Sequence, residues 1–170
     1  MGVSGCGKTT VGEGLAAALG WPFDEGDRYH PPGNIAKMSA HVPLEDADRW
    51  PWLEALARLI AGHEAAGESS VLACSALKRA YRDVLRSGAP RVRFLHLHGS
   101  FAALAARLAA RKGHFFPPDL LRSQFAALEP LGPDEDGGVV DLALDPEAQV
   151  RLGLKELGLE REASGQGRSS

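Results

Sequence analysis

The chain has 170 residues, of which 44% are hydrophobic, and a formal net charge of -3. This length allows one good hydrophobic core but not two ordinary domains, so we expect a single domain. The weak negative charge and the scattered basic residues argue against nucleic acid as a partner, and no apolar run approaches the roughly 18 to 20 residues that span a membrane.

Short apolar runs alternate with longer segments of helical periodicity. This pattern predicts βα units wound into a parallel sheet that is flanked by helices. The elements expected in chain order are helix 8–19, strand 21–24, helix 46–63, strand 70–74, helix 77–86, strand 92–97, helices 101–111 and 118–128, strand 139–144 and helix 146–157. Residues 1–157 should therefore form one domain, whereas residues 158–170 have little apolar content and are expected to be disordered.

A phosphate-binding motif opens the chain. Residues 2–9 match the pattern G-x-x-x-x-G-K-[ST] and run directly into the first expected helix. Backbone N–H groups of such a loop point at phosphates, and the helix N-terminus adds partial positive charge. We expect ATP to bind here, with Lys8 neutralising the transferred phosphoryl group and Thr9 binding Mg²⁺. The expected nucleotide-binding residues are Gly2, Val3, Ser4, Gly5, Cys6, Gly7, Lys8, Thr9 and Thr10.

Only Met1 precedes this loop, although a buried strand normally leads into it. Either the chain is a shortened version of a longer protein, or its sheet lacks a strand that is usually central. We therefore expect the first strand of the fold to be missing from this chain. A nucleotide-binding domain that has lost catalysis is one alternative that this leaves open.

The two cysteines, Cys6 and Cys74, are far apart in sequence, and neither belongs to a CxxC pair. This usage argues against a disulfide framework or a zinc site and is typical of a reducing compartment, so we expect a cytoplasmic protein.

Two carboxylates follow the strand expected at 21–24. Glu25 and Asp27 should lie at the edge of the sheet where the phosphate loop also lies. Glu25 is expected to hold Mg²⁺ through water, and Asp27 to act as the catalytic group that accepts a hydrogen bond from the attacking hydroxyl. Taken alone, the pair could equally be a solvated acidic turn.

Residues 26–38 read GDRYHPPGNIAKM and resemble the segment G-D-x-x-H-P-x-x-N-I-x-K-M of the gluconokinase family. Further likeness is found at residues 43–44, 48–49, 51–53, 74–78, 81–83, 111–116, 124–125 and 128–130, so the resemblance runs from Gly2 to about Asp145. It implies a three-layer P-loop kinase fold with a small lid. It also implies phosphorylation of the terminal hydroxyl of D-gluconate, dependent on ATP and Mg²⁺, by a homodimer.

Gluconate has one carboxylate and a row of hydroxyls, so its site needs a few cations among hydrogen-bonding groups. Within the resemblance, the expected substrate-binding residues are Asp27, His30, Lys37, Ser75, Lys78, Arg82 and His114. Lys78 and Arg82 are one helical turn apart and should share a face. Taken as lone residues, they would instead be a solvated helix face, and His30 a buried structural histidine.

A mobile lid is expected at about residues 111–124, where an alanine-rich helix ends and glycine and proline follow. Its cations would close over the phosphates, with Arg111 as a catalytic residue and Arg107 binding the nucleotide. A solvated helix end is the alternative. Adenine should lie near residues 144–147.

A related kinase for another polyol acid, such as shikimate, also remains open, because that family has a similar acidic pair. Its characteristic substrate arginines and glycine-rich third-strand turn are absent here, since residues 74–78 read CSALK.

Overall fold

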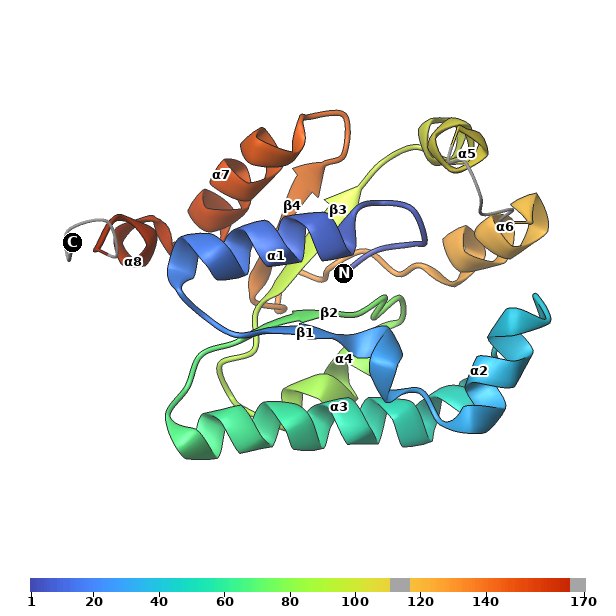
Figure 1. Cartoon of the computed structure of the whole chain (residues 1–170), viewed down its shortest axis with the longest axis horizontal. Coiled ribbons are helices and arrows are strands. Elements are labelled where there is room, and N and C mark those ends of the chain that lie inside the picture. Colours follow the sequence, from blue (N-terminus) through green and yellow to red (C-terminus); the bar gives the residue numbers. More distant parts are fainter. Residues whose placement is uncertain (111–116, 166–170) are drawn as a thin grey trace.

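The computed structural model describes residues 1–110 and 117–165, which form helices and short strands in alternation (Figure 1). In chain order the elements are α1 (Lys8–Leu19), β1 (Phe23–Glu25), the 3-10 helix η1 (Gly26–Tyr29), α2 (Pro32–Ser39), α3 (Asp46–Ala66), β2 (Val71–Ala73), α4 (Arg79–Arg86), β3 (Phe94–His98), α5 (Phe101–Ala109), α6 (Pro118–Ala127), β4 (Gly137–Asp141), α7 (Pro146–Glu156) and α8 (Glu160–Gly165). Every helix and strand expected from the sequence is present, with small shifts at the ends. None of the described helices is long and apolar enough to cross a bilayer.

Three elements were not predicted. η1 and α2 lie between β1 and α3, and α2 begins with Pro32 at a position that favours helix starts. The expectation that the chain is disordered from residue 158 is wrong for the described part, because α8 forms there and Leu159 is buried in the core. Ala163 packs against the same core, and composition alone did not reveal these contacts.

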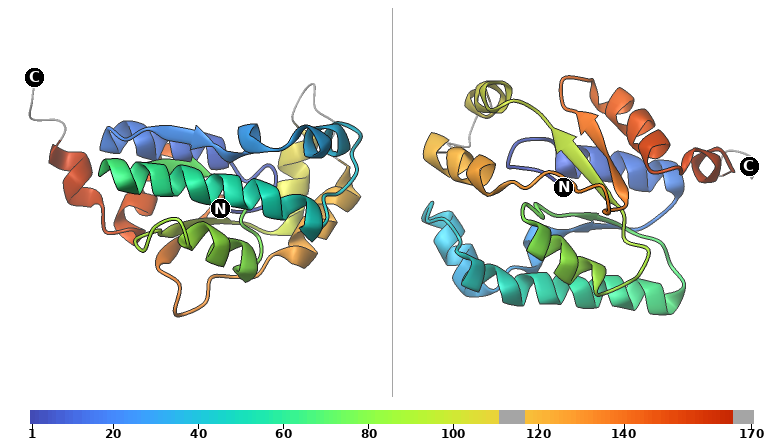
Figure 2. Two further views of the ribbon diagram at one scale, coloured as in Figure 1. Left: turned by 90° about the horizontal axis from the view of Figure 1, so that it is seen from below. Right: turned by 180° about the vertical axis from the view of Figure 1, so that it is seen from behind.

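The strands form two parallel pairs rather than one continuous sheet. β1 pairs with β2 from Phe23 opposite Val71 to Glu25 opposite Ala73, and β3 pairs with β4 from Phe94 opposite Gly137 to His98 opposite Asp141. The parallel α/β class is confirmed. Figure 1 shows α1 and α3 on opposite sides of β1 and β2, and Figure 2 shows the same arrangement from behind.

Met1 joins the two pairs. Its amino group donates to the carbonyl oxygen of Leu95 at 2.5 Å, and its own carbonyl oxygen accepts from the N–H of Leu97 at 2.9 Å. The next N–H, that of Gly2, donates to the carbonyl oxygen of Ser75 at 3.1 Å. The phosphate loop therefore starts at the carboxyl ends of β2 and β3, where ligands bind in parallel α/β folds.

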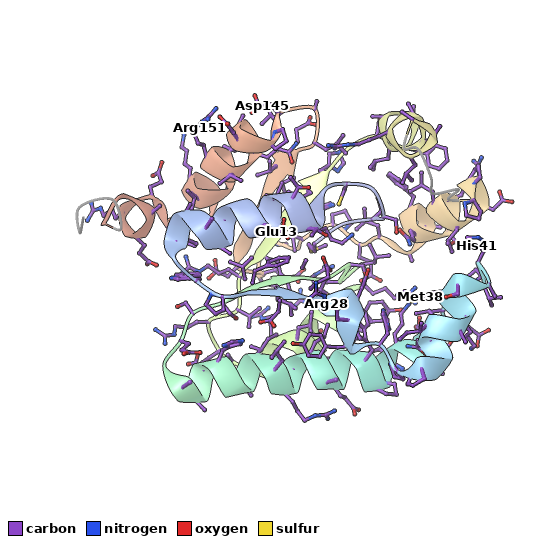
Figure 3. All side chains as sticks on the ribbon, viewed as in Figure 1. Glu13, Arg28, Met38, His41, Asp145 and Arg151 are labelled. Carbon is purple, nitrogen blue, oxygen red and sulfur yellow. The ribbon has the colours of Figure 1, made fainter. Side chains whose placement is uncertain are left out.

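Two hydrophobic cores hold these layers. The first gathers buried side chains of α1, β3, β4 and α7, among them Val11, Leu15, Leu97, Val140 and Leu154. The second lies under α3 and α4 and includes Trp52, Leu53, Leu56, Tyr81 and Leu85. Side chains crowd the space between α1 and α3, whereas Met38 and His41 lie at the end of the molecule that carries α2 (Figure 3).

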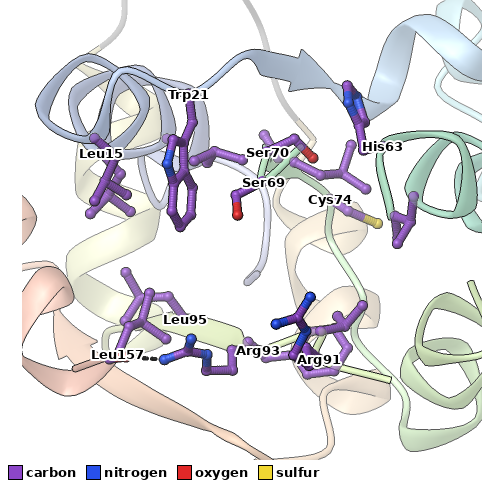
Figure 4. Close-up of a pocket in the computed structure, with 18 of the residues that line it drawn as sticks. Leu15, Trp21, His63, Ser69, Ser70, Cys74, Arg91, Arg93, Leu95 and Leu157 are labelled. Carbon is purple, nitrogen blue, oxygen red and sulfur yellow. Dashed lines mark hydrogen bonds between the residues drawn. The ribbon is translucent and has the colours of Figure 1, made fainter. Parts of the chain in front are cut away.

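A cavity of about 380 Å³ lies between β2 and β3 (Figure 4). Core side chains such as Leu15, Trp21 and Leu95 line it, and the guanidinium of Arg93 bonds the carbonyl oxygen of Leu157 at one side. The cavity runs between the strand pairs, from Lys8 and Cys74 near the carboxyl ends of the strands to Glu68 and Arg91 at their opposite ends.

Candidate active site

The backbone of the phosphate loop is wound for anion binding. Gly5 and Gly7 have φ angles of 80° and 95°, in the left-handed region that favours glycine. A Cβ atom on Gly5 would lie 2.7 Å from Cδ2 of Leu108 in α5, so the loop also packs too closely for a side chain there. Among the described residues no side chain caps α1, and its first turn has no acidic residue. Its N–H groups are thus available to a phosphate.

Side chains hold this loop from both sides. The Lys8 ammonium lies across it and donates to the carbonyl oxygens of Gly2 and Val3 at 3.1 and 3.2 Å. From α6, Gln124 accepts from the N–H of Ser4 at 2.7 Å and donates to its Oγ at 3.0 Å. Sequence reasoning gave Gln124 no role, and only its place within the gluconokinase resemblance pointed to it.

Three further residues of the loop, Val3, Cys6 and Thr10, differ in burial. Val3 and Cys6 are buried in the first core, so only their backbone faces a ligand. Thr10 is exposed in the first turn of α1. Burial also separates the Cys6 thiol from solvent.

Glu25 meets the phosphate loop directly. The Thr9 hydroxyl donates to its carboxylate at 2.6 Å, so the end of β1 and the start of α1 lie side by side. A hydroxyl and a carboxylate are oxygen ligands of the kind that Mg²⁺ prefers. Within the described residues no group of three or more His, Cys, Asp or Glu side chains is arranged to hold a metal ion, so an ion here would take its other ligands from phosphate oxygens and water.

Asp27 lies in η1, two residues beyond Glu25, and 62% of its side chain is exposed. The η1 segment is anchored from below, because the indole N–H of Trp52 in α3 donates to the carbonyl oxygen of Gly26 at 2.8 Å. A buried aromatic residue thus fixes the backbone that presents the carboxylate, while the carboxylate itself stays open to a ligand.

His30 is buried beside Asp27, and its ring stacks on Trp52 with the ring centres 4.1 Å apart. The Asn34 amide nitrogen donates to the carbonyl oxygen of Asp48 and lies 3.1 Å from His30 Nδ1. Nδ1 must therefore accept, which assigns the proton of the neutral ring to Nε2. Burial lowers the pKa of His30, although Asp27 opposes this. Nε2 lies 3.9 Å from Asp27, so His30 presents an N–H donor beside the carboxylate.

Both expected substrate lysines are held by carboxylates at the start of α3. Lys37 donates to the two oxygens of Asp48 at 2.6 and 2.8 Å, and Lys78 to those of Asp46 at 2.8 Å each. The hydrogen bond from each lysine is the main reason why the pKa of its aspartate lies below the ordinary value.

The expectation that Arg82 binds substrate is wrong. Its side chain is 0% exposed, and it bonds both oxygens of Glu135, at 2.6 and 2.8 Å, and four backbone carbonyl oxygens. Lys78 is the N-cap of α4, one turn before Arg82, and its side chain stays partly exposed whereas that of Arg82 is buried. Arg82 therefore fastens the segment 129–135 to α4.

The remaining expected site residues lie around the loop or outside the description. Ser75 is half-buried, and its carbonyl oxygen accepts from Gly2. Arg107 is exposed on α5, next to the Leu108 that covers Gly5. Arg111 and His114, with the first part of the predicted lid, fall among residues 111–116, outside the described residues.

A second pocket, of about 130 Å³, lies beside the phosphate loop. It is formed between the start of α3, the start of α4 and α6, and its lining includes Asp46, Arg49, Lys78, Tyr81 and Gln124. Because Gln124 also bonds Ser4, the pocket adjoins the loop that binds phosphate. Apolar side chains, among them Leu44, Leu77 and Leu120, complete its lining. Polar groups set among apolar side chains are typical of sites for small molecules.

Residues 4–121 match the family model described as shikimate kinase. The gluconokinase of Gluconobacter oxydans is 53% identical over 79% of this chain and 76% of its own length, and the thermosensitive gluconokinase of Escherichia coli is 47% identical over 85% and 78%. A solved sugar kinase from Janibacter sp. covers 96% of this chain and 94% of its own, with 49% identity and a TM-score of 0.90. A gluconokinase from Sinorhizobium meliloti covers 100% and 94%, with 47% identity and a TM-score of 0.86. This chain therefore belongs to the gluconokinase family, within the wider shikimate kinase group of P-loop kinases.

Proposed function

We propose that this chain transfers the γ-phosphoryl group of ATP to the terminal hydroxyl of D-gluconate, giving 6-phospho-D-gluconate and ADP. The observation that carries the proposal is the hydrogen bond from Thr9 to Glu25, which joins the phosphate loop to the segment that presents Asp27. The names of the relatives supply the acceptor, because proteins 47% and 53% identical to this chain are gluconokinases.

In this reaction the hydroxyl oxygen attacks the γ-phosphorus while the bond to the bridging oxygen of ADP breaks. The loop N–H groups and Lys8 hold the phosphates and offset their charge. Asp27 accepts a hydrogen bond from the attacking hydroxyl and so orients that hydroxyl. The proton of the hydroxyl passes to the Asp27 carboxylate or to water. His30, neutral and protonated at Nε2, donates beside it.

Mg²⁺ is proposed as the cofactor, held by Thr9 and, directly or through water, by Glu25. When bound it neutralises phosphate charge. Arg107 and the lid residues Arg111 and His114 are proposed to contact the phosphates and substrate on the strength of the family resemblance. On the same basis we propose a homodimer. The two unpaired cysteines support a cytoplasmic location.

A coupled assay of ADP release over a panel of sugar acids tests the function. Gluconate should be the fastest acceptor, and Lys8→Ala should abolish turnover. Asp27→Asn should lower kcat by at least ~100-fold, in the lower range for a positioned base. Turnover of shikimate without turnover of gluconate would establish the other kinase class. A thermal shift with MgATP but no turnover of any acceptor would instead indicate a binding domain without catalysis.

A further inference from the structure

The carboxylate of Asp27 is held in place mainly through its backbone. Its side chain is 62% exposed, and within the part of the chain that the structure describes its one hydrogen-bond or ion-pair partner is His30 Nε2, at 3.9 Å. The direction of this carboxylate therefore depends on how firmly the short η1 segment, Gly26–Tyr29, is fixed. At the start of η1 the carbonyl oxygen of Gly26 accepts from Trp52. The last residue of η1 is held by a separate contact.

Asp24 anchors this other end of η1. The hydroxyl of Tyr29 donates to Asp24 Oδ1 at 3.0 Å, so the last residue of η1 is tied back to the strand from which η1 emerges. Neighbouring residues of a strand point to opposite faces, so Asp24 points away from the face on which Glu25 meets Thr9. The bond between Asp24 and Tyr29 is therefore separate from the contacts of the proposed Mg²⁺ ligands.

His63, which Figure 4 shows at the edge of the cavity, lies in the last turn of α3 and holds Asp24 in turn. Its Nε2 donates to Asp24 Oδ2 at 3.1 Å, and its Nδ1 faces Glu68 Oε2 at 3.3 Å, which keeps the ring in this orientation. The side chains of His63 and Asp24 are both only 18% exposed, so water competes little for their contact. Each oxygen of Asp24 thus has its own donor, one from η1 and one from α3.

We propose that Tyr29, Asp24 and His63 are positioning residues, which hold the η1 backbone so that the Asp27 carboxylate meets the attacking hydroxyl. This rests on the proposed function and adds to it residues that act through Asp27. Trp52 fixes the first residue of η1 and Tyr29 the last, so Asp27 lies on a segment that is held at both ends. A misplacement of about 1 Å at a reacting group can lower a rate by about 100-fold, so a carboxylate with few contacts of its own depends on such anchors.

Steady-state kinetics of Tyr29→Phe with gluconate and MgATP test the proposal. The change removes one hydroxyl and keeps the ring, so kcat should fall by about 3- to 10-fold, as expected for one hydrogen bond, while the dissociation constant of MgATP stays at the wild-type value. His63→Leu should lower kcat to a similar degree, and His63→Gln, which can still donate to Asp24, should recover most of that loss. Glu64→Gln is the matched control and should behave like the wild type, because Glu64 is an exposed neighbour of His63 that pairs with Arg91 instead.

A double-mutant cycle with Asp27→Asn separates positioning from a general loss of stability. If Tyr29 acts through the Asp27 carboxylate, Tyr29→Phe should not lower kcat further once that carboxylate is gone. An unchanged kcat in both Tyr29→Phe and His63→Leu would overturn the proposal. So would losses of the same size with and without the Asp27 carboxylate, since that result would mark these contacts as structural. Wild-type protein that does not phosphorylate gluconate at all would refute the proposed function itself, whereas an active wild type with unaffected variants would refute only the positioning role.

Discussion

The buried ion pair of Arg82 and Glu135 allows a direct test of whether Arg82 has a structural role rather than a role in substrate binding. Replacing Arg82 with methionine keeps the apolar stem but removes the guanidinium that bonds both carboxylate oxygens of Glu135. The Glu135 side chain is only 1% exposed, so it would be left as a buried carboxylate whose nearest cation is Arg79, at 3.8 Å. Breaking such a pair costs about 3–5 kcal/mol of unfolding free energy.

The assay is urea unfolding followed by circular dichroism at pH 7. For a chain of this length the loss corresponds to a fall in melting temperature of roughly 6–20 °C. The double variant Arg82→Met/Glu135→Leu should recover part of it, because no charge is then left unpaired. If Arg82→Met kept wild-type stability while KM for gluconate rose, the structural role argued for Arg82 would be refuted.

The same pair predicts a pH dependence. The hydrogen bond from Arg82 holds the pKa of Glu135 below its ordinary value. A carboxyl whose pKa is lowered by folding stabilises the protein above its unfolded pKa, and that stabilisation is lost as pH falls through the folded value. The gap in unfolding free energy between wild type and Arg82→Met should therefore narrow on acidification. A gap that stays constant from neutral to strongly acidic pH would contradict this linkage.

Three further outcomes are expected. Gln124→Ala removes both bonds to Ser4, so titration calorimetry should show about 5- to 30-fold weaker binding of ATP, whereas unchanged affinity would mean that α6 does not hold the loop. Gly5→Ala puts a Cβ against Leu108 at a φ of 80°, and should cost about 1–2 kcal/mol in a denaturant series; a neutral result would show that the loop relaxes. Burial raises the pKa of Cys74 to about 11, so iodoacetamide at pH 8 should label it only after unfolding, and rapid labelling of the native protein would contradict its burial.

The order of elements was predictable because turn residues and helix start and stop signals separate the apolar runs from the segments of helical periodicity. Helix α1 is found with the bounds expected for it, since the phosphate motif marks its start and Gly20 ends it with a φ of 65°. α2 was missed because it is short and lies in a polar stretch rich in proline and glycine. The division of the sheet into two pairs was not predictable, because pairing between strands is a property of tertiary structure.

Site residues were predictable where a sequence motif fixes the backbone. They were not predictable where a long side chain can pair with residues distant in sequence. Thr9 and Glu25 meet as expected, because Thr9 lies in the first turn of α1 and Glu25 is the last residue of β1. Arg82 has the charge and spacing of a ligand-binding residue, and only Glu135, 53 positions away, reveals that it is buried.

The two hydrophobic cores have a consequence for local opening. Leu53 and Leu85 belong to the core under α3 and α4, whereas Leu15 and Val140 belong to the core around α1 and α7, and a cavity of about 380 Å³ lies between the strand pairs. Amide hydrogens in the two halves should then exchange as separate cooperative units, each with its own opening free energy. The phosphate loop, which begins at the seam between them, would be the place where a bound nucleotide ties the two units into one.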